Sequence, residues 1–320
     1  MTLDLRPQPI EPPRTVHRFD VSAEGLGRYT IDVSLPPGDH APDARFPVIL
    51  AVDGNLLFEI VQPHLHSEHA RQAGLIPDSI LVGVGYPTDE GDASFYARRN
   101  FDFHGPWDMN DGLGRVLHQI FGMLKAADNK PDMQITAGGY DRFMAFLRDE
   151  LLPALASRFP VDTNARHTLI GDSSGGHFVL RAIYDASSPF RRYVCISPSF
   201  GAAEGSIQKL EADYAASHQD LDLDLFICCG SVEVDQNIMA AYCRFGSGVM
   251  WIAEQFAQRQ WPSARVKWEV MNNEDHHSIP ARAVAAGLRS VHGIRPGVND
   301  EEVAKQGAAK MAALKARSKT

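Results

Sequence analysis

Apolar and polar residues follow two distinct patterns along this chain of 320 residues. Residues 16–35 alternate apolar with polar side chains on both sides of a glycine-containing turn, which predicts two antiparallel strands. Six later runs are largely apolar and end in turns, and they begin at residues 46, 78, 168, 193, 223 and 264. Such runs are typical of strands covered on both faces, so we expect a buried central sheet.

Helical spacing of apolar residues fills the stretches between these runs. Residues 142–159 place large apolar side chains on one face, and a shorter helix is expected to begin at Gly176. Helical patterns also cover residues 248–259 and 280–292. Strands that alternate with helices indicate a mostly parallel sheet with helices on both faces. Opening strands followed by such repeats predict the α/β-hydrolase fold.

The same pattern suggests one domain with an extension at each end. Residues 1–15 are rich in proline and predict a loose N-terminal arm, residues 16–299 form the α/β-hydrolase domain, and residues 300–320 form a C-terminal helical tail. Within the domain, residues 89–135 are long and rich in aromatic side chains, with a helix expected from Gly114. Because connections of this length in a compact domain are usually functional, we predict a lid or substrate-binding insertion.

Composition narrows the range of partners. The formal net charge is −9 and no run of five like charges occurs, which argues against a nucleic-acid partner. No apolar stretch approaches 18 residues and no secretory signal is visible, so we expect a cytoplasmic protein without a membrane partner. The four cysteines have no metal-ligand spacing, which predicts reduced thiols and neither a metal nor a cofactor. Homo-oligomerisation is left open.

The segment GDSSG, from Gly171 to Gly175, matches the pattern G-x-S-x-G and makes Ser173 the predicted nucleophile. An apolar strand precedes it and a helical pattern follows, as expected for a serine on a sharp strand-to-helix turn. Such a turn aims backbone N–H groups and the start of a helix dipole at developing negative charge. The alternative is an ordinary turn between a strand and a helix.

A serine hydroxyl needs a base to remove its proton, and in this fold the acid and then the histidine follow the serine along the chain. His276 and His277 occupy the polar loop after the last expected strand, and we favour His276 as the base.

The acid is expected in the loop after the preceding strand. Glu233, three residues past Gly230, is favoured over Asp235. Asp275 and a dyad without an acid are further alternatives.

The oxyanion hole requires backbone N–H groups at two turns. One donor is expected at Ser174, and the other at Asn55, where the segment VDGN ends a strongly apolar strand. The alternative for Asn55 is an ordinary tight turn.

Taken together, these segments resemble the esterase D or "putative esterase" branch of the α/β-hydrolases, and in particular the siderophore trilactone esterases. The resemblance covers residues 45–290 and is carried by VDGN, YARRNFD, GGYDRFMAFLRDELLP, GDSSGG, SPSF and EDHHSIP. It implies the fold and ester hydrolysis. It also maps the catalytic histidine onto His276 and supports Asn55 and Glu233 in the roles given above.

The sequence therefore predicts a serine carboxylic-ester hydrolase that works through an acyl-enzyme on a small-molecule ester, which could be bulky or a lactone. An acyltransferase using the same acyl-enzyme and a non-catalytic binding protein are the alternatives. Arg98 and Arg99 are candidates for binding a carboxylate or catecholate on the substrate. Asp102 is a further candidate substrate-binding residue. The alternative is an ion pair between an arginine and Asp102 that pins the loop.

Overall fold

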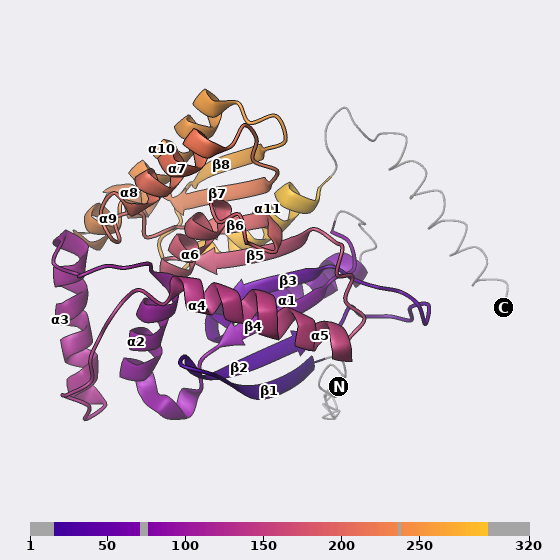
Figure 1. Cartoon of the computed structure of the whole chain (residues 1–320), viewed down its shortest axis with the longest axis horizontal. Coiled ribbons are helices and arrows are strands. Elements are labelled where there is room, and N and C mark those ends of the chain that lie inside the picture. The colour runs from indigo at the N-terminus through magenta and orange to yellow at the C-terminus, as the bar shows by residue number, and fades with distance from the viewer. Residues whose placement is uncertain (1–15, 71–75, 236–237, 294–320) are drawn as a thin grey trace, which may run out of the picture.

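Eight strands form one sheet in the computed structural model, which describes residues 16–70, 76–235 and 238–293 (Figure 1). Their order is β1-β2-β4-β3-β5-β6-β7-β8; β1, β2 and β4 pair antiparallel, and all pairs from β4 to β8 are parallel. The strands are β1 Val16–Ala23, β2 Gly27–Ser34, β3 Val48–Val52, β4 Ile80–Gly85, β5 His167–Asp172, β6 Phe190–Ile196, β7 Asp224–Gly230 and β8 Arg265–Met271.

The predicted hairpin and all six predicted apolar strands are confirmed. Every residue of β3, β4 and β7 is buried, as expected for strands with helices on both faces. The expectation of two-sided cover was wrong for β8, where only Met271 is buried. Trp268 and Val270 are 49% and 38% exposed, and β8 is the last strand in the order of the described sheet.

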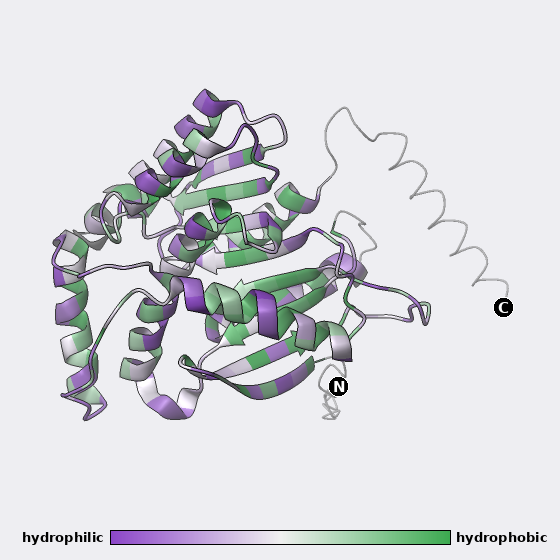
Figure 2. Cartoon of the chain, in the orientation of Figure 1, coloured by the Kyte–Doolittle hydropathy of each residue, from purple (hydrophilic) through white to green (hydrophobic). Residues whose placement is uncertain are grey.

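Two layers of helices cover the sheet, and side chains alternate between them along each strand. Ile49 and Ala51 of β3 face the layer of α1 (Gly54–Ala70) and α11 (Ile279–His292). Val48, Leu50 and Val52 face the opposite layer. That layer contains α6 (Ser174–Ile183), α7 (Ser206–Ser217) and α10 (Phe245–Arg259), together with α4 (Tyr140–Ala145), η2 (Phe146–Leu151) and α5 (Leu152–Arg158). Figure 2 shows the resulting apolar strands between helices of mixed hydropathy.

The helix predicted over residues 142–159 is one continuous helical segment, whose middle six residues have π-helical geometry. The helix α1 carries Pro63 and several polar side chains, and it was not expected from the sequence. The predicted arm, residues 1–15, and tail, residues 300–320, lie outside the described residues.

The predicted insertion contains three helical elements: η1 (Thr88–Glu90), α2 (Gly91–Phe103) and α3 (Gly112–Ala127). In Figure 1, α3 stands at the left edge of the molecule, beyond the ends of the strands. It packs against α2 and against α9 (Ile238–Cys243), which follows α8 (Ser231–Asp235). The insertion is thus positioned at the carboxyl edge of the parallel strands.

Candidate active site

A cavity of about 590 Å³ lies at the carboxyl edge of the parallel strands, and three of the predicted site residues approach it from three different strands. Ser173 follows β5, Glu233 follows β7, and His276 follows β8. Carboxyl ends of parallel strands share one edge of a sheet, so residues far apart in sequence meet there. Ser173 and His276 both line the cavity, and Glu233 lies behind His276.

Ser173 has a strained backbone, with φ +59° and ψ −114°. Its N–H donates to the carbonyl of Ile196 at 3.0 Å, and its carbonyl accepts from the N–H of Ser199 at 2.9 Å. A side chain at Gly175 would meet Asp53 Oδ2 at 2.9 Å. One at Gly171 would collide with the carbonyl of Gly175. The two glycines are therefore required by close approach, and the turn projects Ser173 toward the cavity.

His276 is held on one side by Glu233 and on the other by an aromatic ring. Its Nδ1 lies 2.6 Å from Glu233 Oε1, and its ring stacks on that of Phe245, with centroids 4.7 Å apart and planes at 21°. Glu233 is buried, and its Oε2 accepts from Ser197 Oγ at 2.7 Å and from the N–H of Gly230 at 2.5 Å. These two hydrogen bonds orient the Glu233 carboxylate independently of its contact with the imidazole.

Opposing effects act on the pKa of His276. Burial disfavours the charged imidazolium, but the hydrogen bond to Glu233 and the negative charges of Asp172 and Glu233 outweigh burial and raise the pKa above its ordinary value. Because Nδ1 donates to Glu233, the neutral ring carries its lone pair on Nε2. That is the tautomer a general base requires.

The two predicted oxyanion positions differ in their surroundings. Ser174 lines the cavity as the first residue of α6. Asn55 is exposed at the start of α1, and the cavity is lined instead by its neighbour Leu56. The Asn55 side chain holds the end of β4, because Nδ2 donates to the carbonyl of Tyr86 at 2.8 Å and Oδ1 accepts its N–H at 2.6 Å. The role of its backbone N–H remains a prediction.

The two arginines suggested by sequence have different environments. Arg98 lies outside the cavity lining, with its guanidinium 4.8 Å from the ring centroid of Tyr29 and 5.1 Å from that of Tyr86. Asp102 is buried beside them and accepts from the hydroxyls of the same tyrosines at 2.7 and 3.1 Å. Arg98 and Asp102 therefore lie in a polar cluster that anchors α2 to β2 and β4.

Arg99 lines the cavity but is held by a buried carboxylate. Its Nε and Nη2 each donate to Asp53 at 2.7 Å, and Nη2 also donates to the carbonyl of Asp172 at 3.0 Å. This ion pair ties α2 to the ends of β3 and β5. A structural role accounts for these contacts.

We expect Arg99→Met to lower the free energy of unfolding by about 3–5 kcal/mol, because the Asp53 carboxylate would stay buried without its partner. The matched control is Arg28→Met, which removes an exposed arginine paired with Asp89 at 3.0 Å and should destabilise the protein much less. Urea unfolding of both variants measures the difference. Equal losses would contradict a buried structural ion pair.

The remaining acid and base candidates do not contact His276 through any hydrogen bond in the described residues. Asp275 accepts from the N–H groups of His277 and Ser278 at 2.9 and 2.8 Å, which is a turn-stabilising arrangement. The side chain of Asp235 lies outside the part of the chain that the structure describes. His277 is exposed at the rim of the cavity.

Several residues of this site were not expected from the sequence. Ser197 and Phe245 fix Glu233 and His276, and Asp53 holds Arg99. Asp172 lines the cavity with Oδ1 buried and without a hydrogen-bond partner, and burial raises its pKa to about 7. Its position inside GDSSG was a signal that could have drawn attention to it, whereas no local pattern marks Phe245.

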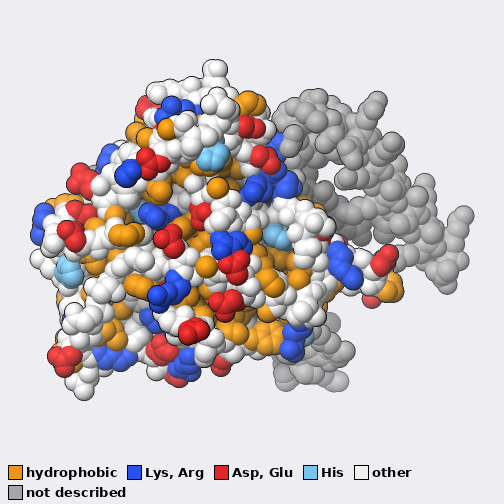
Figure 3. Space-filling model, in the orientation of Figure 1, with side chains coloured by type: hydrophobic (Ala, Val, Ile, Leu, Met, Phe, Trp, Pro, Cys, Tyr) orange, Lys and Arg blue, Asp and Glu red, His pale blue; other side chains and the backbone are white. Residues whose placement is uncertain are grey.

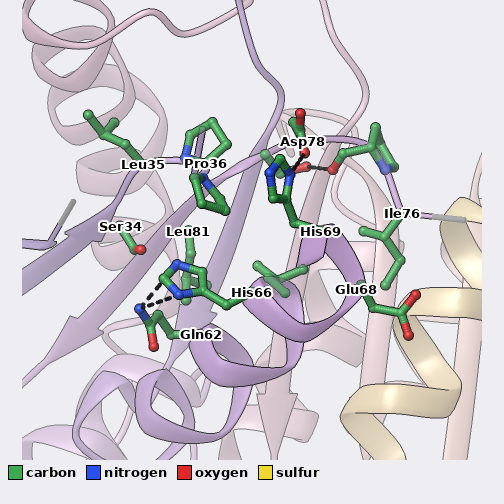
Figure 4. A pocket seen from close by; sticks show the side chains of 14 residues that line it. Ser34, Leu35, Pro36, Gln62, His66, Glu68, His69, Ile76, Asp78 and Leu81 are labelled. Carbon is green, nitrogen blue, oxygen red and sulfur yellow. Dashed lines mark hydrogen bonds and ion pairs between the residues drawn. The ribbon is translucent and has the colours of Figure 1, made fainter. Parts of the chain in front are cut away.

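A second hollow lies at the opposite edge of the sheet, between α1 and the start of β4 (Figure 4). His69 Nδ1 lies 2.9 Å from Asp78 Oδ1 there, and Gln62 contacts His66. Its volume of about 20 Å³ is room for a single water molecule, so it holds no substrate-sized ligand. Within residues 16–70, 76–235 and 238–293, no cluster of three or more His, Cys, Asp or Glu residues could hold a metal, and no helix is long and apolar enough to cross a membrane.

The sequence of this chain is similar to those of known proteins. The sequence pattern of the putative esterase family matches residues 128–288, just over half of the chain. The ferri-bacillibactin esterase BesA of Bacillus subtilis (strain 168) is 25% identical over 281 residues, which cover 87% of this chain and 89% of that protein. A siderophore enterobactin esterase of Emericella nidulans is 30% identical over 199 residues, or 60% of each protein.

Solved structures show the same fold. The siderophore hydrolase EstA from Aspergillus nidulans aligns with a TM-score of 0.73 at 22% identity, over 89% of this chain and 97% of that one. The BES protein from Bacillus cereus aligns with a TM-score of 0.69 at 21% identity, over 92% of this chain and all of that one. The predicted α/β-hydrolase fold is thereby confirmed.

Proposed function

This chain belongs to the putative esterase family and is a carboxylic-ester hydrolase, and from this premise we propose that it works through an acyl-enzyme on Ser173. The observation that carries the proposal is the 2.6 Å contact between His276 Nδ1 and Glu233 Oε1, in a histidine that lines the same cavity as Ser173. A serine, an imidazole and a buried carboxylate from three strands form the set that acyl transfer through serine requires.

In the first half-reaction, Ser173 Oγ attacks the ester carbonyl while His276 Nε2 takes the hydroxyl proton. Glu233 stabilises the resulting imidazolium. The tetrahedral oxyanion is bound by the N–H of Ser174 and by a second N–H from the β3–α1 turn, for which Asn55 is our candidate. His276 then gives its proton to the leaving alkoxide, and the C–O bond of the ester breaks to release the alcohol.

The second half-reaction reverses these roles with water. His276 removes a proton from a water molecule, whose oxygen adds to the acyl carbon of the Ser173 ester. Collapse of the tetrahedral intermediate breaks the bond to Oγ, and the proton held on His276 returns to Ser173. The carboxylic acid leaves, and the free enzyme is regenerated. The names of the relatives, which include siderophore esterases, make an ester or lactone siderophore one substrate candidate.

We expect Glu233→Gln to lower kcat/KM by about 10²- to 10⁴-fold, because an amide can present a donor to Nδ1 and favour the wrong tautomer. Only the neutral imidazole acts as base, so kcat/KM rises with pH through the pKa of His276. Since Glu233 helps to raise that pKa, its replacement should also move the acid limb of the kcat/KM profile to lower pH.

Asp275→Asn is the matched control, because it changes the exposed carboxylate next to His276 and should leave kcat/KM within about threefold. The measurement is the pH dependence of p-nitrophenyl butyrate hydrolysis for all three proteins. A larger loss in Asp275→Asn than in Glu233→Gln would transfer the role of the acid to Asp275.

A further inference from the structure

We infer that the cavity beside Ser173 selects neutral esters with an extended apolar acyl group, and that one face of α3 is the wall that binds this group. The inference rests on the proposed function of Ser173 and adds the class of substrate. It is carried by three properties of the cavity: the apolar face of α3, the apolar residues opposite it, and the lack of an unpaired cation in the described lining.

The apolar face of α3 is turned toward the cavity. Five of its side chains line that space, and their spacing of four, three, one and three residues puts them on one side of a helix: Leu113, Leu117, Ile120, Phe121 and Leu124. Met123 lies on the other side and is 67% exposed. Leu113 and Phe121 are buried, whereas Leu117, Ile120 and Leu124 are half-buried, so α3 leaves part of its apolar face accessible from the cavity.

Apolar side chains from two other helices face the same space. Leu56 and Ile60 of α1 line it beyond the end of β3, and Phe95 and Tyr96 line it from α2. Leu56 is 54% exposed and Tyr96 is 39% exposed, so ligand binding could remove further apolar surface from water. With a volume of about 590 Å³, the cavity is in the range of small-molecule sites, and an acetyl group would leave most of it unfilled.

Charge in the described lining disfavours an anionic substrate. Arg99 is the one Lys or Arg among the described side chains that line the cavity, it is 8% exposed, and its charge is balanced by Asp53 through two bonds of 2.7 Å. His104 also lines the cavity, but burial lowers its pKa to about 4, which keeps the ring neutral near pH 7. The carboxyl of Asp172 faces the same space. Burying a substrate carboxylate here without an unpaired cation would be costly.

The outer surface differs from this lining. Figure 3 shows acidic and basic side chains interspersed over the face turned to the viewer. A charged ester that enters the cavity would therefore exchange water for an apolar wall. A neutral acyl chain would instead replace water along α3 while its carbonyl remains beside Ser173.

The test compares kcat/KM for p-nitrophenyl acetate, butyrate and octanoate with that for mono-p-nitrophenyl suberate, which carries a terminal carboxylate on a chain of matched length. We expect the value for octanoate to exceed that for acetate by about tenfold or more, since each methylene buried adds to binding. We expect suberate to fall at least about tenfold below octanoate. An equal or higher value for suberate, or no gain with chain length, would overturn the inference.

Substitutions in α3 test whether this helix binds the acyl group. Leu117→Ser and Ile120→Ser should each lower the octanoate-to-acetate ratio of kcat/KM by about fivefold. Met123→Ser, on the exposed side of the same helix, should leave the ratio unchanged. An unchanged ratio in both lining variants would overturn the role of α3, and the wild-type series tests substrate class even if a variant fails to fold. Loss of all ester hydrolysis by the wild type would instead refute the proposed function.

Discussion

Ser173→Ala is expected to lower kcat for p-nitrophenyl butyrate by at least about 10⁴-fold, because it removes the atom that forms the acyl-enzyme. Any residual rate would come from binding and the oxyanion donors alone. The turn itself should survive, since the strain at φ +59° is supported by backbone hydrogen bonds to Ile196 and Ser199 that alanine retains. The melting temperature is therefore expected to stay within a few degrees of wild type.

The measurement combines ester kinetics with labelling by a fluorophosphonate, which should modify the wild type and not the variant. Ser174→Ala is the matched control: it removes the adjacent hydroxyl but keeps the backbone N–H proposed for the oxyanion hole. Its kcat should stay within about fivefold of wild type. Retention of a tenth or more of wild-type activity in Ser173→Ala would refute the nucleophile.

His276→Gln is expected to lower kcat/KM by about 10⁴-fold, nearly as much as loss of the serine, since the two groups act as a unit. Glutamine keeps similar length and polarity but has no lone pair suited to accept the serine proton. The remaining activity should rise with pH without the inflection that His276 produces. A pH–rate profile of the purified variant measures both effects.

The neighbouring histidine provides the control. His277 also lines the cavity, yet it is exposed and makes no hydrogen bond to Glu233 within the described part of the chain, so His277→Gln should change kcat/KM by less than about tenfold. The opposite result, with a large loss at His277 and a small one at His276, would reassign the base to His277. Full activity in both variants would contradict a histidine base.

Much of the fold was predictable because its signals are local. The strands β3, β4 and β7 are short apolar runs bounded by turns, and a buried parallel strand gives that pattern in any chain. The π-helical turn within residues 146–151 and the exposed face of β8 were not predictable, since both depend on what packs against them. The helix α1 was missed for the same reason: its polar residues weaken the periodic pattern, whereas packing against the sheet stabilises it.

The sequence by itself determined the sharp turn at Ser173, because the two glycines that permit close approach lie within two residues of it. Only the tertiary structure decided that Glu233 contacts His276, that Arg99 pairs with Asp53, and that the apolar face of α3 borders a cavity. The physical reason is that neighbouring carboxylates or arginines in a loop look alike in sequence. Their side-chain directions and partners are set by elements far away along the chain.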